Sequence, residues 1–268
     1  MRYFVHIGYK GTRYAGWQYQ PAQLSVQQVL ESSLGKILKT TVKIFGCGRT
    51  DAGVHASQFF FHVDIEDKWD FDLFFRWNRI LPDDIAIFDI IPMQGLPHAR
   101  FDATQRTYDY FIHTYKDPFL SDSSALYLRG NLNLKAMKQA VDLLPKYKDY
   151  RAFCKSPDKN EHTICHVSSA SLFINPAGDR IRFCISSNRF LGRMIRILTR
   201  KLIEISDGTL SVDEFESHFI SKETPALIFP APPQGLYLSK VTYPDLDLEV
   251  RGDFSSLTTL DKNPWIEF

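Results

Sequence analysis

The sequence has few cysteines and no long apolar run. Four cysteines are spread over 268 residues, which is too few and too scattered for a disulfide framework. No apolar run approaches the roughly 18 residues that a membrane span needs, and the N-terminal residues lack the apolar stretch of a secretory signal. We therefore expect a protein of the reducing cytoplasm, without a membrane segment.

The chain also lacks an excess of charge of either sign. Lys and Arg number 32 and Asp and Glu number 31, so the formal net charge is +1. A hydrophobic fraction of 44% and a charged fraction of 24% are ordinary values for a globular protein and argue against a disordered or fibrous chain. Any polyanionic partner must be met by a local basic surface, because the overall charge does not supply one.

Several common catalytic motifs are missing. The phosphate loop, G-x-G-x-x-G and G-x-S-x-G do not occur, which argues against nucleotide-driven chemistry, nicotinamide chemistry and serine hydrolysis. Cys154, His162, Cys165 and His166 lie near one another in the sequence. They lack the paired C-x-x-C spacing of a structural zinc site, so we predict no metal.

The spacing of apolar residues predicts two halves with the same order of elements. In the first half, strands are predicted at 2–8, 41–45, 57–65 and 85–91, and helices at 24–39 and 70–81. In the second half, strands are predicted at 107–115, 166–174, 180–187 and 235–243, and helices at 134–144, 190–205 and 212–220. Ser25, with Gln28 three residues later, marks the start of the first helix. The β-α-β-β-α-β order is that of ferredoxin-like folds and of RNA-recognition modules.

We therefore predict an α+β fold made of two tandem ferredoxin-like halves, residues 1–103 and 104–246. Together they form a mixed, mainly antiparallel sheet with helices on one face and a central catalytic cleft. The polar tail, residues 247–268, is expected to pack irregularly.

The first candidate site is the glycine-rich run GCGRTDAGVHA at residues 46–56. Asp51 stands two residues after Arg49, and an arginine neighbour favours an ionised carboxylate suited to nucleophilic or electrostatic work. The alternative is a turn in which the aspartate caps its own loop. Spacing alone favours the turn.

Two further patterns point to nucleic acid. Arg189, Arg193, Arg196 and Arg200 are spaced by 4, 3 and 4 residues, so on a helix they form a stripe about 60° wide that suits phosphate oxygens. The alternative is an ordinary solvated face. In the strand QRTYDYFIH, tyrosines 108 and 110 share one face, which suits stacking on nucleobases or packing in the core.

Several motifs occur together in one order: GTRYAGWQ, GRTDAGVHA, HARFDA followed by RTYDY, FCKS and GLYLSKVTYP. In this order and spacing the chain resembles the TruA-type tRNA pseudouridine synthases of bacteria, along nearly its whole length up to about Pro244. GRTDAGVHA is the most specific of the motifs. Given this resemblance, we favour the catalytic interpretation of Asp51 over the turn.

The resemblance implies an isomerase that converts uridine to pseudouridine without a cofactor. The target uridines would lie in the anticodon stem-loop of tRNA, at positions 38–40, and must leave their stack to react. Asp51 would be the catalytic nucleophile, and Arg49 would hold the backbone of the flipped nucleotide. Tyr108 would stack on the target uracil and accept the proton from its ring carbon, and Arg196 would pair with Asp51. Arg189, Arg193 and Arg200 would bind the substrate, and a homodimer would cradle the tRNA.

The chain departs from the family pattern near the arginines. Gly192-Arg193 replaces a usual His-His or Arg-Asn pair, and Ile197 and Arg200 also differ from the usual residues. The same chemistry on other uridines is therefore one alternative. A non-catalytic RNA-binding module is a second, although binding alone needs no carboxylate in the motif. A glycosidase is a third, but that chemistry needs a second acid, and Asp64 and Glu66 are more simply solvated.

Overall fold

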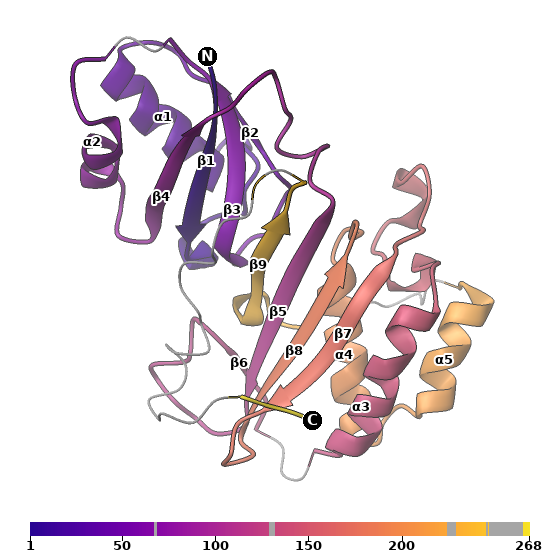
Figure 1. Ribbon diagram of the computed structural model, residues 1–268. Coiled ribbons are helices and arrows are strands. Elements are labelled where there is room, and N and C mark those ends of the chain that lie inside the picture. The colour runs from indigo at the N-terminus through magenta and orange to yellow at the C-terminus, as the bar shows by residue number, and fades with distance from the viewer. Residues whose placement is uncertain (67–68, 129–131, 224–228, 245, 247–264) are drawn as a thin grey trace. The chain divides into compact units, whose positions relative to one another are not determined.

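The computed structural model describes residues 1–66, 69–128, 132–223, 229–244, 246 and 265–268 (Figure 1). The chain divides into two compact units. Unit 1 holds the described residues of 1–104 and 237–254, and unit 2 holds those of 105–236 and 255–268. Both units combine helices with a sheet, which confirms the predicted α+β class.

Unit 1 follows the predicted β-α-β-β-α-β order. Its elements are β1 (Arg2–Tyr9), the 3-10 helix η1 (Gly11–Arg13), α1 (Val26–Leu38), β2 (Ile44–Gly46), β3 (His55–Asp64), α2 (Leu73–Ile80), β4 (Ile85–Pro92) and, from its second residue on, β9 (Leu236–Thr242). Antiparallel pairs give the order β2-β3-β1-β4. The chain returns after unit 2 to lay β9 parallel to β3, with His55 opposite Tyr237.

Local sequence signals explain where the helices of unit 1 begin and how they pack. The hydroxyl of Ser25 accepts a hydrogen bond from Gln28 N at 3.2 Å, as the sequence predicts, and Asp72 caps α2 in the same way. Trp77 on α2 is fully buried, donates from Nε1 to Ser33 on α1 at 2.8 Å, and packs its ring against Phe61 of β3. The two helices therefore cover the same face of the sheet.

β3 is buried on both faces, although its sequence alternation predicts one apolar face. On one face Phe59 stacks on Trp17 and Phe61 packs against Trp77 of α2. On the opposite face Phe60 and His62 are 1% and 2% exposed. The ring of Tyr243 packs edge-on against Phe60, and the backbone N–H of Ala99 donates to Nδ1 of His62 at 3.2 Å. Segments far along the chain cover this face, so local periodicity does not reveal its burial.

Unit 2 holds β5 (Gln105–His113), β6 (Ala125–Leu126), α3 (Leu134–Leu143), β7 (Val167–Ile174), β8 (Arg180–Ser187), α4 (Met194–Ser206), α5 (Val212–Ser221) and β10 (Ile266–Glu267). Its 3-10 helices are η2 (Leu144–Lys146), η3 (Arg151–Phe153), η4 (Pro157–Lys159) and η5 (Pro233–Gly235). Antiparallel pairs give the strand order β10-β7-β8-β5, and β6 runs parallel to β5. α3 packs against both α4 and α5.

Two expectations need correction in unit 2. The sequence predicts a helix from residue 190, but α4 begins at Met194, because Arg193 lies in the left-handed region with φ 63° and interrupts helical geometry. The tail was expected to be irregular, yet Ile266 and Glu267 form β10 against β7. Residues 247–264 of the predicted tail lie outside the described residues.

No helix in the described parts of the chain combines the length and apolar character that crossing a membrane requires.

The buried His62 makes stability depend on pH. Burial, with further contributions from Arg2 and His98, lowers its pKa from 6.5 to about 4. Between these values the unfolded chain binds a proton that the folded chain does not, so stability falls as the pH drops from about 6.5 toward 4. We expect His62→Gln to lose less stability than the natural protein between pH 7 and pH 4.5 in thermal unfolding. An equal loss in both proteins would contradict this assignment.

Candidate active site

The Asp51 loop, which we define as residues 47–54, connects β2 to β3 in unit 1. The loop starts where Cys47 N donates to Phe60 O at 2.7 Å, and it ends in a turn where Val54 N donates to Asp51 O at 3.2 Å. Gly53 takes φ 76° within that turn. Because a backbone carbonyl closes the turn, any residue at position 51 could supply that bond. The carboxylate of Asp51 is therefore not required for this closing bond.

The segment that holds the GTRYAGWQ motif is hydrogen-bonded to the Asp51 loop and braces it. Trp17 N donates to Thr50 O and Gly53 N donates to Tyr14 O, each at 3.2 Å. The hydroxyls of Tyr9 and Thr50 share a buried hydrogen bond of 2.8 Å. Thr50 is 8% exposed, whereas Asp51 is partly exposed. The bracing bonds therefore fix the residue on the N-terminal side of Asp51 and leave its carboxylate partly open.

Two glycines of the bracing segment are needed for this close approach. Gly16 has φ 99°, and a Cβ placed on it would lie 2.4 Å from Thr50 O. A Cβ on Gly11 would lie 1.9 Å from Val54 O, and Gly11 N donates to Nδ1 of the buried His55 at 2.9 Å. The two motifs are thus adjacent in space because glycine lets their backbones touch.

The predicted site residues divide between the two units. Arg49 and Asp51 share the loop in unit 1, and Arg49 is exposed. Tyr108, Arg196 and the other nominated arginines belong to unit 2.

Tyr108 lies on β5, opposite Ile185 of β8. Its side chain is 9% exposed, and its ring stands edge-on to Phe190 at 5.1 Å between centroids and 81° between planes. Phe190 therefore limits rotation of the Tyr108 ring. The apolar spacing predicts Phe190 as one residue of the buried side of a helix and gives no sign of this contact.

Tyr110, which shares a strand face with Tyr108, is a core residue. It is fully buried, and its hydroxyl donates to Pro232 O at 2.7 Å. Burial raises its pKa well above 10. Of the two alternatives left open by the sequence, packing in the core is the correct one for Tyr110.

Arg196 stands in the first turn of α4 and holds the segment before β9. Its Nε donates to Ala231 O at 2.7 Å, and Ala231 N donates back to Arg196 O at 2.8 Å. A Cβ on Gly235, farther along this segment, would lie 2.8 Å from Phe111 O. The guanidinium of Arg196 is therefore oriented by the backbone it binds.

The four nominated arginines do not form one helical stripe, which corrects the sequence prediction. Only Arg196 and Arg200 lie on α4, since Arg193 is its N-cap and Arg189 precedes it. Arg189 bonds the ring nitrogens of His162, at 3.0 Å to Nε2. Arg200 Nε donates to Glu204 at 2.8 Å. Lys201 donates to the other oxygen of Glu204 at 2.9 Å, so Arg200 belongs to a surface ion-pair group that the spacing of the arginines does not reveal.

The cysteines and histidines considered for a metal are otherwise engaged. Cys165 is fully buried, and burial raises its thiol pKa to about 12. His162 is exposed and bonded to Arg189, and Cys154 accepts a bond from Asn160 at 3.6 Å. The described residues contain no group of three His, Cys, Asp or Glu side chains able to hold a metal ion.

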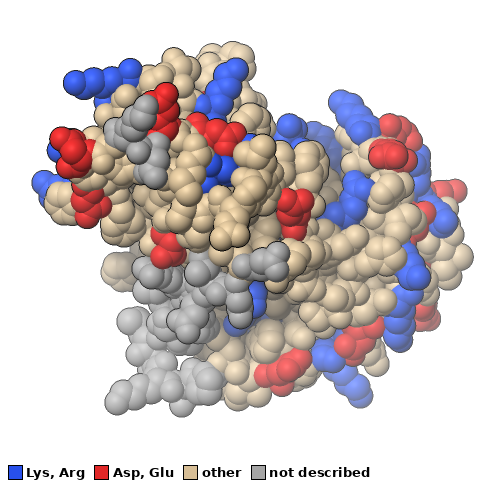
Figure 2. All heavy atoms as spheres, turned by 45° about the horizontal axis from the view of Figure 1, so that its top comes forward, with Lys and Arg blue, Asp and Glu red and all other residues tan. Residues whose placement is uncertain are grey.

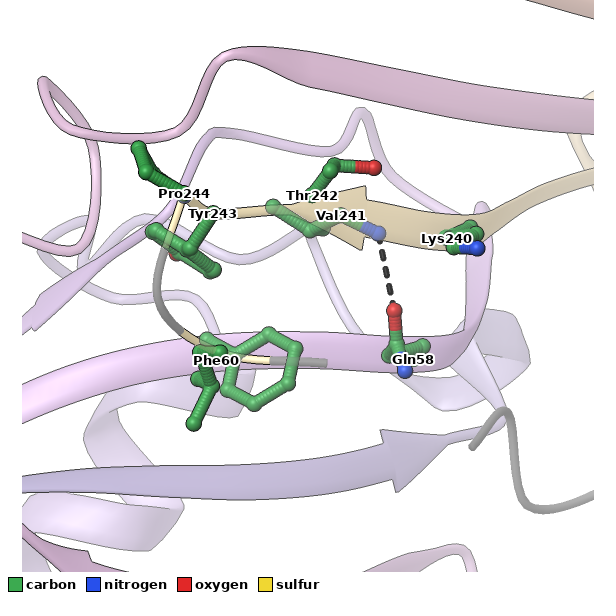
Figure 3. A pocket seen from close by; sticks show the side chains of 8 residues that line it. Gln58, Phe60, Lys240, Val241, Thr242, Tyr243 and Pro244 are labelled. Atoms are coloured by element: carbon green, nitrogen blue, oxygen red, sulfur yellow. Dashed lines mark hydrogen bonds between the residues drawn. The ribbon is translucent and has the colours of Figure 1, made fainter. Parts of the chain in front are cut away.

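A cavity of about 320 Å³ lies in unit 1 between β3 and the end of β9 (Figure 3). Gln58 and Phe60 line it from β3, and Gln58 Oε1 accepts a hydrogen bond from Val241 N at 2.8 Å. Its described lining includes none of the predicted site residues, so it is distinct from the Asp51 loop. On the face shown in Figure 2, basic and acidic side chains are interspersed, as the small net charge suggests.

The chain is similar to known tRNA pseudouridine synthases. Residues 147–244 match a family model described as tRNA pseudouridine synthase. Over longer stretches, the chain is 39% identical to tRNA pseudouridine synthase A of Parabacteroides distasonis, covering 91% of this chain and 96% of the relative. It is 36% identical to the protein of that name from Bacteroides thetaiotaomicron, covering 97% of each. The chain therefore belongs to the tRNA pseudouridine synthase A family.

Proposed function

We propose that this protein is an isomerase that converts uridine to pseudouridine in tRNA, with Asp51 as the nucleophile. The observation that carries the proposal is the intact GRTDAGVHA motif, whose loop is hydrogen-bonded to the segment that holds the GTRYAGWQ motif. The chain is similar to a tRNA pseudouridine synthase A over 91% of its length. A carboxylate that the turn does not need for its closing bond is well suited to a chemical role.

The reaction exchanges one bond of the base for another. The bond from the uracil nitrogen to the sugar breaks, the base rotates, and a bond from its ring carbon to the sugar forms. That carbon loses a proton, and the released nitrogen gains one. Substrate and product are isomers, so the overall change consumes no other reactant. A base within a structured arm must first leave its stack, which costs a few kcal/mol.

The proposed roles follow the family motifs. Asp51 supplies the nucleophilic carboxylate, and the exposed Arg49 holds the backbone of the flipped nucleotide. Tyr108 stacks on the uracil and accepts the proton of its ring carbon, and its contact with Phe190 supports a fixed ring position. Arg196 supplies the positive charge of the site, with an orientation supported by its bond to Ala231.

We further propose that the target uridines lie in the anticodon stem-loop, that a homodimer cradles the tRNA, and that the enzyme works in the cytoplasm with its substrate.

Gly192, one of the departures from the family pattern, has nothing within 4 Å of the position of a Cβ. Packing therefore does not require glycine there, and the open space favours an altered contact with the RNA.

The salt dependence of tRNA binding tests the arginines individually. We expect affinity to fall with rising salt, and Arg193→Gln to reduce the slope of log affinity against log salt by about one, as for one phosphate contact. Arg200→Gln is the matched change and should reduce it less, because the Arg200 guanidinium is bonded to Glu204. Filter binding with an unmodified transcript measures both. Equal slopes for all three proteins would contradict phosphate contact by Arg193.

Pseudouridine mapping tests the proposed function. Unmodified tRNA is incubated with the protein and no added cofactor, treated with carbodiimide and read by primer extension. Stops in the anticodon arm are the expected result. Stops elsewhere would retain the chemistry and move the target. Salt-sensitive binding without stops in any tRNA would favour a non-catalytic RNA-binding module instead.

A further inference from the structure

An aromatic cluster in unit 1 is formed by Phe45, His62, His98 and Phe101, none of which is a nominated site residue. Phe45 stacks on His62 with centroids 5.0 Å apart and planes 15° apart. His62 meets His98 edge-on at 4.5 Å, and His98 lies 4.3 Å from Phe101. Phe45 is on β2, and His98 and Phe101 are on the connection that follows β4.

The two ends of the cluster are open to solvent. Phe101 is 74% exposed and Phe45 is 50% exposed, whereas His62 between them is 2% exposed. The buried ring supports the exposed ones and holds them at the surface. The exposed faces of large rings favour a partner that can stack on them.

The turn that carries Phe101 is held by five hydrogen bonds. Ala99 N donates to Nδ1 of His62 at 3.2 Å, and Arg100 N donates to Nδ1 of His98 at 3.0 Å. His98 N donates to Asp102 at 2.8 Å, and Asp102 N donates to His98 O at 3.1 Å. Tyr243 closes the set with a bond of 2.6 Å from its hydroxyl to Ala99 O. Phe101 is therefore exposed on a pre-ordered turn, which lowers the entropy cost of binding.

The turn presents one exposed cation, Arg100, beside the carboxylate of Asp102 that His98 N binds. Both histidines accept a backbone N–H at Nδ1, so these nitrogens carry no proton, and burial lowers the pKa of each imidazole. Arg100 is exposed, and its guanidinium carbon lies 5.7 Å from the centre of the Phe101 ring. An aromatic face beside a guanidinium is the combination that binds an unstacked base and its phosphate.

We propose that Phe101 stacks on an unpaired base of the tRNA other than the target uracil, and that Arg100 contacts the neighbouring phosphate. This inference rests on the proposed function, because it takes tRNA as the substrate. A nucleobase needs only one ring and one cation, whereas a stable protein interface buries more than about 1,000 Å². The paired ring and guanidinium favour RNA over a protein partner.

Binding of a labelled, unmodified tRNA transcript tests the proposal. All variants carry Asp51→Asn, so that turnover does not interfere. We expect Phe101→Ala to weaken binding about tenfold, as for loss of one stacked base, and Phe101→Tyr to restore affinity to within about twofold. Leu96→Ala is the matched control, because Leu96 is 75% exposed, lies in the same connection and has no ring. Arg100→Gln should reduce the salt slope by about one, and Phe101→Ala should leave it unchanged.

The outcomes separate this proposal from the function on which it rests. Unchanged affinity in Phe101→Ala, with pseudouridine formed by the protein with Asp51 intact, would overturn the stacking role alone. If Phe101→Ala changed the oligomeric mass of the protein and left its tRNA affinity unchanged, the ring would pack against another copy of the protein, and the stacking role would be overturned. Equal weakening in Leu96→Ala and Phe101→Ala would also overturn it, since base stacking requires the ring. Failure of the Asp51-intact protein to form pseudouridine would instead count against the proposed function.

Discussion

Asp51→Asn is expected to lower pseudouridine formation by at least about a thousandfold, because an amide of the same shape is a far weaker nucleophile than a carboxylate. The fold should tolerate the change. The side chain is partly exposed, and Val54 N bonds the backbone carbonyl of residue 51, which the substitution keeps. The thermal midpoint should therefore shift little, and tRNA binding should persist.

Asp83→Asn is the matched control for this experiment. Asp83 is an exposed aspartate of unit 1 on the turn before β4, so the substitution removes the same charge outside the Asp51 loop. Single-turnover assays on both variants, with affinity measured separately, divide chemistry from binding. An Asp51→Asn protein that forms pseudouridine at the natural rate would remove Asp51 from the role of nucleophile, and equal losses in both variants would point to a general effect of charge.

The order of elements could be predicted from the sequence, because apolar spacing reflects which side of each element is buried. It could not show that β3 is buried on both faces, since Phe60 and His62 are covered by Tyr243 and by the turn at Ala99. Apolar spacing also predicts a start of α4 at residue 190, four residues before the observed start at Met194. Apolar spacing continues through Leu191, but the left-handed backbone of Arg193 is a property of conformation that the spacing does not report.

The Asp51 loop could be found from the sequence as a motif, and its surroundings could not. Nothing local to residues 46–56 indicates that Tyr9, Tyr14 and Trp17 hold the loop. The signal that could have found them is the pair of glycines in GTRYAGWQ, which allows two backbones to touch. Arg200 and Glu204 are four residues apart in the sequence, a spacing that permits an ion pair on a helix. Their hydrogen bond is established by the structure alone.

Gly16→Ala tests whether the bracing segment controls the chemistry at Asp51. Alanine at φ 99° is strained, and its methyl group would lie 2.4 Å from Thr50 O and 3.1 Å from the carbonyl carbon of Asp51. The loop must move to relieve this overlap. We expect a loss of about 2 to 4 kcal/mol of stability and, because small misplacements of reacting groups are costly, a fall in turnover of about a hundredfold.

Gly95→Ala separates strain in the backbone from displacement of the loop. Gly95 also has a positive φ, of 71°, but nothing lies within 4 Å of its Cβ position. It should lose about 1 to 2 kcal/mol of stability and keep its turnover. Both variants are assayed well below their unfolding midpoints, so that only folded enzyme is compared. If folded Gly16→Ala turned over as fast as Gly95→Ala, the brace would be a support of the fold alone. The expected difference would instead show that the N-terminal motif positions Asp51 through contacts between backbones.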